Sequence, residues 1–372
     1  MCSEQVPVNQ PRESSRATTI RTPDDPALDA LCRQLASAAD ELDLSGDWPR
    51  RQLELCGQYG VYRWFVPASH GGFEWSDADV YRGYFRLASA CLTTTFIITQ
   101  RTGACRRLVT SPNRELQRRL LPPLVEGAAF ATVGISHLTT SRRHLGQPAM
   151  RATKTAGGYV LDGFSPWVTG GPHAQVVVVG VTLDDGREML VALPTDARGV
   201  TTNEPARLVA LTASHTGAVR CEAVFVESDA VVDGPRENIM VQGGASTGGL
   251  QTSALALGLA QAAVDFLSDE ADRRGDLASP ASRLQEDCVA QTQELVALAE
   301  GRSSASTEQF RATANGLALR ASQAALAAAK GSGYLAGHPA GRWCREALFF
   351  LVWSCPQGVV DAHLCELAGL AD

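Results

Sequence analysis

The chain has 372 residues, of which 45% are hydrophobic and 20% charged, so it can bury a large core divided into two or three domains. Lys and Arg number 33 against 40 Asp and Glu, which gives a formal net charge of −7. No block of basic residues offers a footprint for a phosphate backbone. This balance argues against nucleic acid as a partner.

The sequence shows no targeting or membrane signal. By inspection, no apolar stretch reaches the roughly 18 residues of a membrane span, and the N-terminal segment lacks the apolar core of a signal peptide. The ten cysteines stand singly, without a CxxC pair, which is typical of reduced and mostly buried thiols. The seven histidines show no metal-ligand spacing. We therefore expect a cytoplasmic protein that binds no metal and no membrane.

The N-terminal third is predicted to be helical after a polar arm. Residues 1–24 are rich in Ser, Arg, Thr and Pro, which predicts a disordered N-terminal arm. Over residues 25–127 apolar side chains recur at intervals of three and four, as in LDALCRQLASAADEL, and RELQRRLLPPLVEG ends with glycine. We expect an N-terminal helical domain there.

The remainder of the chain changes period twice. Over residues 128–235 the spacing becomes two, and short β-branched runs such as AQVVVVGVTL are separated by Gly, Asp, Asn and Pro, which predicts a middle antiparallel β-domain. Residues 240–372 return to helical spacing in four long segments that are apolar over most of their circumference. Such segments predict a C-terminal four-helix bundle, so the fold class is α+β.

This order of elements, over this length, resembles the acyl-CoA dehydrogenase superfamily of FAD-dependent flavoproteins. Four stretches carry the resemblance and together cover nearly the whole chain after the arm. They are RRLLPPLVEGAAFATVGIS, GGYVLDGFSPWVTGGPHAQVVVV, ALALGLAQAAVDFLSDEADRR and AAKGSGYLAGHPAGRWCREA.

The resemblance implies that Trp167 and Thr169 lie against the flavin ring. A Trp at the edge of a β-domain can pack on that large aromatic plane, and Thr169 offers a hydroxyl and a backbone N–H near the redox nitrogen. Ser136 matches a threonine that contacts the pyrimidine edge of the flavin in the family. The alternative for Trp167 is a buried ring in the core of a hairpin.

A cofactor shared between subunits is also implied. Arg274 and Gln285 match residues that reach the FAD of a neighbouring subunit, so we expect a homodimer or homotetramer. The pattern departs from the family at Leu277 and Ala278, where Phe-Gly is usual. Arg274 could equally be a solvated residue at a helix end.

A glycine turn matches the place where the family's backbone approaches the FAD diphosphate. The matching residues are Gly331 and Gly333, while Lys330 replaces a glycine. The turn follows a helix rather than a strand, so it is not a Rossmann fingerprint. A helix C-cap followed by a loop would need the same glycines.

Arg142, Arg143 and His144 replace the Gly-Ser-Asp of the family beside the expected substrate mouth. Guanidinium groups match carboxylates and phosphates in a two-point fashion, so these residues could bind a phosphopantetheine phosphate or a substrate carboxylate. A solvated loop without a partner is the alternative.

The largest departure concerns the catalytic carboxylate. In the family it removes an α-proton from an acyl thioester while hydride leaves the β-carbon for the flavin, and it usually follows an Arg-Asp-Ala motif. Here Arg345, Glu346 and Ala347 match the motif, but Ser354 stands at the position of the glutamate. The second position known in the family corresponds to Gly248. The chain thus resembles a divergent member that lacks the usual base, and a general base is typically worth about 10²–10⁴ in rate.

Three explanations remain open at this point. Another residue could supply the base, although Glu346 lies roughly 12 Å from Ser354 along a helix axis. The flavin could instead perform oxygen chemistry, or the protein could bind a flavin or thioester without turnover. Further candidates for a relocated base are Asp361, His363 and Glu366.

We therefore predict an FAD-dependent oxidoreductase of acyl-CoA dehydrogenase type that acts on an acyl thioester, of CoA or a carrier protein, or on a similar small substrate. A flavin-dependent monooxygenase or N-hydroxylase is the alternative, and a non-catalytic binding module the second. A flavin reductase or an electron-transfer protein is a possible partner.

Overall fold

The computed structural model describes residues 19–139, 148–242 and 249–370. Its N-terminal part is helical, as the spacing predicts. Three of these helices begin at side-chain caps, since Asp25 accepts a hydrogen bond from the Ala27 N–H, Ser76 accepts one from the Asp79 N–H and Asn113 accepts one from the Leu116 N–H. The helices are α1 (Pro26–Ser45), α2 (Arg50–Gln58), α3 (Asp77–Ala90), α4 (Leu92–Val109) and α5 (Arg114–Glu126).

The packed part of the chain begins before residue 25. Ile20 is fully buried, and its N–H donates a hydrogen bond to the carbonyl oxygen of Tyr59 at 2.9 Å. The composition of residues 1–24 predicts an arm because polar residues dominate it. One apolar side chain with a backbone hydrogen bond is enough to fix the last residues of this predicted arm against the helices.

The middle of the chain forms one sheet. Among the described residues its strands are ordered β6-β7-β3-β2-β4-β5-β8, with β1 paired to β4. The strands are β1 (Ala131–Gly134), β2 (Met150–Thr155), β3 (Gly158–Val168), β4 (Val176–Leu183), β5 (Glu188–Pro194), β6 (Val200–Thr202), β7 (Gly217–Glu227) and β8 (Val231–Arg236).

The sheet is not purely antiparallel. Strands β1 and β2 each pair with β4 in parallel, while the other neighbours run antiparallel. The prediction of an antiparallel domain is wrong at these two pairs. A period of two fixes which side chains share a face, but it does not fix the direction of strands that are not joined by a hairpin.

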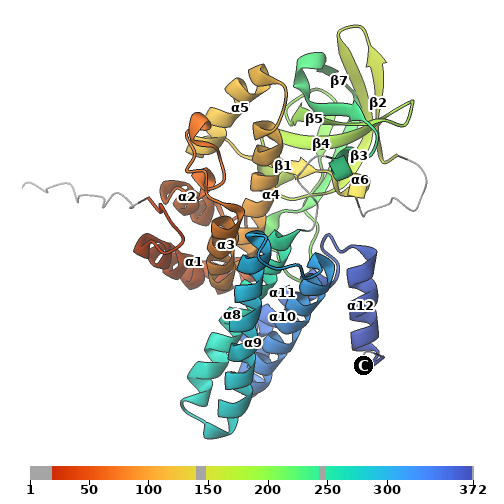
Figure 1. Ribbon diagram of the computed structural model, residues 1–372. Coiled ribbons are helices and arrows are strands. Elements are labelled where there is room, and N and C mark those ends of the chain that lie inside the picture. Colours follow the sequence, from red (N-terminus) through yellow and green to blue (C-terminus); the bar gives the residue numbers. More distant parts are fainter. Residues whose placement is uncertain (1–18, 140–147, 243–248, 371–372) are drawn as a thin grey trace, which may run out of the picture.

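Helices return after the sheet and confirm the predicted order of layers. They are α8 (Leu250–Ala271), α9 (Ala278–Ala299), α10 (Thr307–Ala329), α11 (Pro339–Ala347) and α12 (Gln357–Leu367), with the short helices α6 (Ser136–Thr139) and α7 (Ile239–Gln242) beside the sheet. Figure 1 shows the sheet at one end of the molecule, the helices of the first domain beside it, and the bundle extending away from both.

Helix α8 corrects one expectation from the sequence. Over Leu250–Ala271 it is long and apolar enough to cross a membrane by length and composition, although 72% of the tested window is buried inside the protein. Its side chains pack against α3, α9 and α10. It is therefore a helix of the core, and its apolar circumference reflects neighbours on most sides.

The last predicted bundle helix ends early. The sequence predicts a helical run through Trp353, but α11 ends at Ala347 and only a 3₁₀ turn, Leu348–Leu351, follows. The carbonyl oxygen of Phe350 accepts a hydrogen bond from Asn315, on α10, instead of from a helical N–H. Side chains from a neighbouring helix thus replace the next turn of α11.

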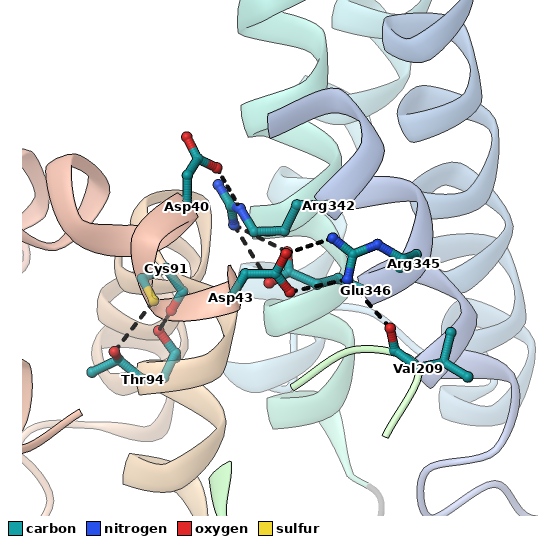
Figure 2. Close-up of polar contacts among 9 residues, drawn as sticks. Asp40, Asp43, Cys91, Thr94, Val209, Arg342, Arg345 and Glu346 are labelled. Atoms are coloured by element: carbon teal, nitrogen blue, oxygen red, sulfur yellow. Dashed lines mark hydrogen bonds and ion pairs between the residues drawn. The ribbon is translucent and has the colours of Figure 1, made fainter. Parts of the chain in front are cut away.

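Buried charges join α11 to the first domain (Figure 2). Arg342 lies 2.8 Å from Asp40 and 3.2 Å from Glu346, and both partners of the second pair are almost fully buried. Arg345 donates to Asp43 at 3.0 Å. Because Asp40 and Asp43 belong to α1, these pairs fix the bundle against the N-terminal helices.

Candidate active site

A cavity of about 700 Å³ lies where the three layers meet. Its lining comes from α3 and α4, from β1 and the end of β3, from the loop 208–210, from the start of α8, and from the turn after α11. Cofactor and substrate sites commonly occupy about 300–1,000 Å³, so the cavity has the size of a small-molecule site. Side chains do not fill the space between sheet and bundle.

Three of the predicted flavin contacts line this cavity together. Trp167, at the end of β3, is 52% exposed, so the alternative of a buried hairpin Trp is wrong. Thr169 is buried and shares a hydrogen bond with the hydroxyl of Thr216 at 3.0 Å. The hydroxyl of Ser136 is buried without a hydrogen-bond partner. A large exposed ring beside the unpartnered hydroxyl of Ser136 is a suitable surface for a polar aromatic ligand.

Ser354 also lines the cavity, on the turn that follows the 3₁₀ segment. Its φ is 50°, in the left-handed region that few non-glycine residues adopt. Its hydroxyl is buried without a partner, while its carbonyl oxygen accepts a hydrogen bond from Arg311 at 2.7 Å. The backbone at this position is therefore held by α10, and the side chain is left free for a ligand.

The wall beside Ser354 is aromatic. The rings of Phe349 and Trp353 stack at 5.0 Å, with an angle of 14° between their planes. Phe96, on α4, contacts both rings edge-on, at 4.9 Å from Phe349 and 5.0 Å from Trp353. This side of the cavity is thus suited to an apolar part of a ligand.

None of the four acids and bases considered as a relocated base lines the cavity. Glu346 is 1% exposed and pairs with Arg342, and burial raises its pKa to about 6 against the opposing effect of that cation. The other three candidates have partners outside the cavity lining. Asp361 accepts a hydrogen bond from Gln357, His363 accepts one from Asn315, and Glu366 forms an ion pair with Arg320. Among the described lining residues the sole acid is Asp77, whose carboxylate accepts from Arg106 at 2.6 Å.

The remaining cofactor residues lie at the far end of the bundle. Arg274 follows α8 and donates a hydrogen bond to the carbonyl oxygen of Ala328 at 2.9 Å, which is close in sequence to Gly331 and Gly333. Gln285, on α9, accepts from Gln261. The connection between α8 and α9 lies far from the sheet in Figure 1. These four residues therefore form a group apart from the cavity of their own chain.

Within the glycine turn, position 333 leaves no room for a side chain, whereas nothing lies within 4 Å of a Cβ built at Gly331. Lys330 has a φ of 55°, and a side chain at Gly333 would bring its Cβ to 2.7 Å from the Cβ of Ala329. The three residues proposed for anion binding, Arg142, Arg143 and His144, lie outside the described residues.

The sequence interpretation missed the arginines of the cavity. Among the described residues, Arg106 and Arg107 at the end of α4 and Arg345 on α11 all contribute to its lining. The available signal was the helical face of α4, where Thr99, Gly103 and Arg107 recur at intervals of four. The part of the chain that the structure describes holds no cluster of His, Cys, Asp or Glu that could bind a metal.

Comparison with known proteins agrees with this architecture. The family model of the acyl-CoA dehydrogenase N-terminal domain matches residues 24–128. The chain is 25% identical over 261 residues to YngJ of Bacillus subtilis, described as a probable acyl-CoA dehydrogenase, with 68% of each chain covered. It is also 25% identical over 347 residues to the mitochondrial isovaleryl-CoA dehydrogenase of Solanum tuberosum, covering 85% of this chain and 82% of that one.

Solved structures share the fold at lower sequence identity. Butyryl-CoA dehydrogenase of Megasphaera elsdenii superposes with a TM-score of 0.79 at 17% identity, covering 92% of this chain and 98% of that one. The nitrososynthase of Micromonospora carbonacea var. africana gives 0.75 at 22% identity, with 92% and 95% covered. KijD3 in complex with FMN and a dTDP-sugar gives 0.72 at 20% identity, with 93% of each chain covered.

The layered fold with its cavity between sheet and bundle defines an oxidoreductase-type flavoprotein architecture. Helical domain, sheet and bundle follow one another as the sequence predicts, and three of the residues predicted to contact a flavin, Ser136, Trp167 and Thr169, fall on the cavity wall. Residues 24–128 match the family model of the acyl-CoA dehydrogenase N-terminal domain, and the relatives and shared fold support the acyl-CoA dehydrogenase superfamily, whose members are flavoproteins with FAD as the typical cofactor. Ser354, which the resemblance in sequence places at the position of the usual glutamate, lines this cavity.

Proposed function

We propose that this protein is an FAD-dependent oxidoreductase that acts on a small substrate without a carboxylate base, as a flavin-dependent monooxygenase or N-hydroxylase. The observation that carries the proposal is the neutral catalytic position. Ser354 lines the cavity with an unpartnered hydroxyl, and the one acid among the described lining residues, Asp77, is already paired with Arg106.

The cavity fits a flavin by size and by lining. Trp167 would pack on the ring system, Thr169 would offer its backbone and hydroxyl to the ring edge, and Ser136 would supply a hydrogen bond that its hydroxyl does not make within the protein. Bound FAD would supply two-electron redox chemistry and, when reduced, the activation of O₂. The protein would contribute orientation and the exclusion of water.

Desaturation of an acyl thioester needs a group that removes an α-proton. Loss of a general base typically costs about 10²–10⁴ in rate, so a desaturase would not leave this position neutral without a substitute. Thr139 and Gly249 both line the cavity. In the sequence, Thr139 is followed by TSRRHLGQ and Gly249 is preceded by GGASTG, and neither segment contains Asp or Glu. No carboxylate is thus available from these neighbouring segments.

Dehydrogenation of an acyl thioester, of CoA or a carrier protein, is the second candidate. Relatives named as acyl-CoA dehydrogenases support it, and Ser354 opposes it. The fold itself does not decide, because the nitrososynthase and the butyryl-CoA dehydrogenase both share it. A binding module without turnover is the third outcome that the experiment below separates.

The assembly and location are part of the same proposal. A homodimer or homotetramer would place Arg274, Gln285, Gly331 and Gly333 of one subunit against the cofactor of another. A flavin reductase or an electron-transfer protein would supply or remove electrons. The composition supports a cytoplasmic location. Arg142, Arg143 and His144 stay candidates for contact with a thioester phosphate or a substrate carboxylate.

The test uses the purified protein loaded with FAD. For a monooxygenase we expect a yellow protein that consumes O₂ with NAD(P)H, a flavin reductase and substrate, and incorporates one oxygen atom while the other leaves as water. Anaerobic bleaching of the flavin by butyryl-CoA or isovaleryl-CoA would instead support the dehydrogenase. A protein that takes up no FAD would contradict both redox functions and leave the binding module.

A further inference from the structure

Arg107 is a buried cation with an unused hydrogen-bonding capacity. It lies in the last turn of α4, is 9% exposed, and lines the cavity. Its Nη1 atom donates to the carbonyl oxygen of Gly103, one turn earlier, at 2.8 Å. No carboxylate within the described part of the chain forms an ion pair with it. A guanidinium carries five N–H donors, so most of its capacity is not used by the protein.

The other arginines of the cavity differ in this respect. Arg106 lies 2.6 Å from the carboxylate of Asp77, and Arg345 donates to Asp43 at 3.0 Å and to the carbonyl oxygen of Val209 at 3.3 Å (Figure 2 shows the Arg345 contacts). These two cations are neutralised by the protein. Arg107 occupies the same cavity without such a partner.

An unpaired buried charge is costly in a protein interior. Burial lowers the pKa of Arg107 to about 10, and no nearby acid opposes this effect. The group still carries its charge at neutral pH, because about 10 lies well above 7. Protein interiors rarely keep such a charge without a partner, and a partner supplied by a ligand would relieve the cost.

We propose that Arg107 binds the anionic group of the substrate, a carboxylate or a phosphate, at the sheet end of the cavity. The guanidinium would hold that group through two parallel hydrogen bonds. Phe96, which belongs to the aromatic wall, lies 11 positions before Arg107 on α4, and this separation spans roughly 16 Å at 1.5 Å per residue. The inferred substrate is therefore an elongated molecule with an apolar part and an anionic end.

This inference rests on the proposed function only in treating the cavity as the substrate site. A competing role for Arg107 would be contact with the pyrimidine edge of the flavin, which becomes electron-rich on reduction. The neighbouring Val133, on β1, also lines the cavity and packs near Gly103. The experiment therefore has one arm for the substrate and one for the cofactor.

The substrate arm uses three probes of equal chain length: octanoate, octyl phosphate and uncharged octanamide. Binding to the FAD-loaded protein is measured by calorimetry. We expect octanoate or octyl phosphate to bind about 10- to 100-fold more tightly than octanamide, which is the usual advantage of a hydrogen bond to a charged group. In Arg107→Gln the preference should fall to within about threefold, and Arg107→Lys should retain part of it.

The matched control is Arg118→Gln on α5, which removes the same charge from an exposed side chain paired with Glu115. It should keep the full preference for the anion. Equal affinities of octanoate, octyl phosphate and octanamide in the unchanged protein would overturn the proposal, and so would an Arg107→Gln variant that keeps the preference.

The cofactor arm measures FAD affinity and the flavin midpoint potential in Arg107→Gln. If FAD affinity or the midpoint potential changes in this variant while the preference for the anionic probes stays the same, Arg107 contacts the flavin and the proposal is overturned. If the protein takes up no FAD, the proposed function fails, but titration of the flavin-free protein with the same probes, followed by the fluorescence of Trp167 and Trp353, still decides the anion site.

A thermal measurement guards against misfolded variants. Arg107→Met removes a buried charge that lacks an internal partner, so its melting temperature in the absence of ligand should equal or exceed that of the unchanged protein. Octanoate should raise the melting temperature of the unchanged protein and not that of the variant. A marked loss of stability in Arg107→Met would indicate a structural role and contradict the proposal.

Discussion

Arg311 holds the backbone at Ser354, since its Nη1 atom donates a hydrogen bond to the Ser354 carbonyl oxygen at 2.7 Å. Its Nη2 atom donates to the preceding carbonyl oxygen, that of Trp353, at 2.6 Å. One side chain of α10 thus fixes two successive peptides of the turn that carries Ser354. The turn is thus held by a neighbouring helix as well as by its own backbone hydrogen bonds, such as that from the Trp353 N–H to the Phe349 carbonyl oxygen at 2.9 Å.

Replacing Arg311 should loosen this turn. In Arg311→Met both carbonyl oxygens lose a charged donor, and each such bond is worth about 1.5–3 kcal/mol, so we expect the free energy of unfolding to fall by about 3–6 kcal/mol. Urea denaturation measures this change. The control is Arg320→Met on the same helix, where the half-exposed side chain has only distant acid partners, at 3.9 and 3.6 Å, and the loss should stay below about 1 kcal/mol.

A carboxylate restored at Ser354 should restore proton abstraction. We expect Ser354→Glu, loaded with FAD, to be bleached by butyryl-CoA under anaerobic conditions at least about 10²-fold faster than Ser354→Gln, which has the same shape without the base. Both variants place a larger side chain at a φ of 50°, so strain cancels in the comparison. Equal rates in the two variants would show that position 354 does not face the reacting carbon.

Glu346 should make stability depend on pH. Burial raises its pKa from 4.5 to about 6, with Arg342 opposing. The folded state therefore binds this proton more readily than the unfolded chain, and the free energy of unfolding should rise by about 2 kcal/mol from this group as pH falls from about 6 to 4.5.

Glu346→Gln should remove that rise, as measured by urea denaturation at several pH values between 4.5 and 7. Glu115→Gln is the control, because the Glu115 carboxylate is 65% exposed and its pair with Arg118 lies in solvent. A pH profile of Glu346→Gln identical to that of the unchanged protein would contradict the prediction.

Trp167 and Trp64 should separate cofactor binding from stability. Trp167 is 52% exposed on the cavity wall, so Trp167→Ala should weaken FAD binding about 10-fold or more and change the free energy of unfolding by less than about 1 kcal/mol. Trp64 is 1% exposed and stacks on Trp75 at 4.4 Å. Trp64→Ala should lower the free energy of unfolding by about 3–5 kcal/mol. Flavin fluorescence measures the FAD affinity of both variants, and urea denaturation measures their stability.

Cysteine reactivity should follow burial. Burial raises the pKa of Cys32 to about 11 and that of Cys288 to about 12, while Cys365 is exposed. In a variant with Cys2→Ser, which removes a thiol outside the described residues, a disulfide reagent at pH 7.5 should modify Cys365 rapidly and the other thiols only on unfolding. Cys365→Ser should abolish the fast phase, and fast modification of several native thiols would contradict the prediction.

Much of the fold was readable from local patterns. The switch from helical spacing to a period of two and back again sets the order of the layers, and the described helices and strands follow it. The expected positions Ser136, Trp167, Thr169 and Ser354 also meet at one cavity. The strand directions at β4 and the end of α11 were not readable, because they depend on contacts between segments distant in sequence.

The sequence by itself determined the α+β order and the resemblance to the superfamily, with a neutral residue at position 354, since these depend on periodicity and on residue types at fixed spacings. Only the tertiary structure decided which charges are free. Arg342 meets Asp40 across 302 positions of the chain, and Glu346 is thereby committed to a buried pair and not to catalysis. Among the residues that the structure describes, Arg107 gains no such partner when the layers pack. Pairing is set by distances in the folded chain, and no local spacing encodes those distances.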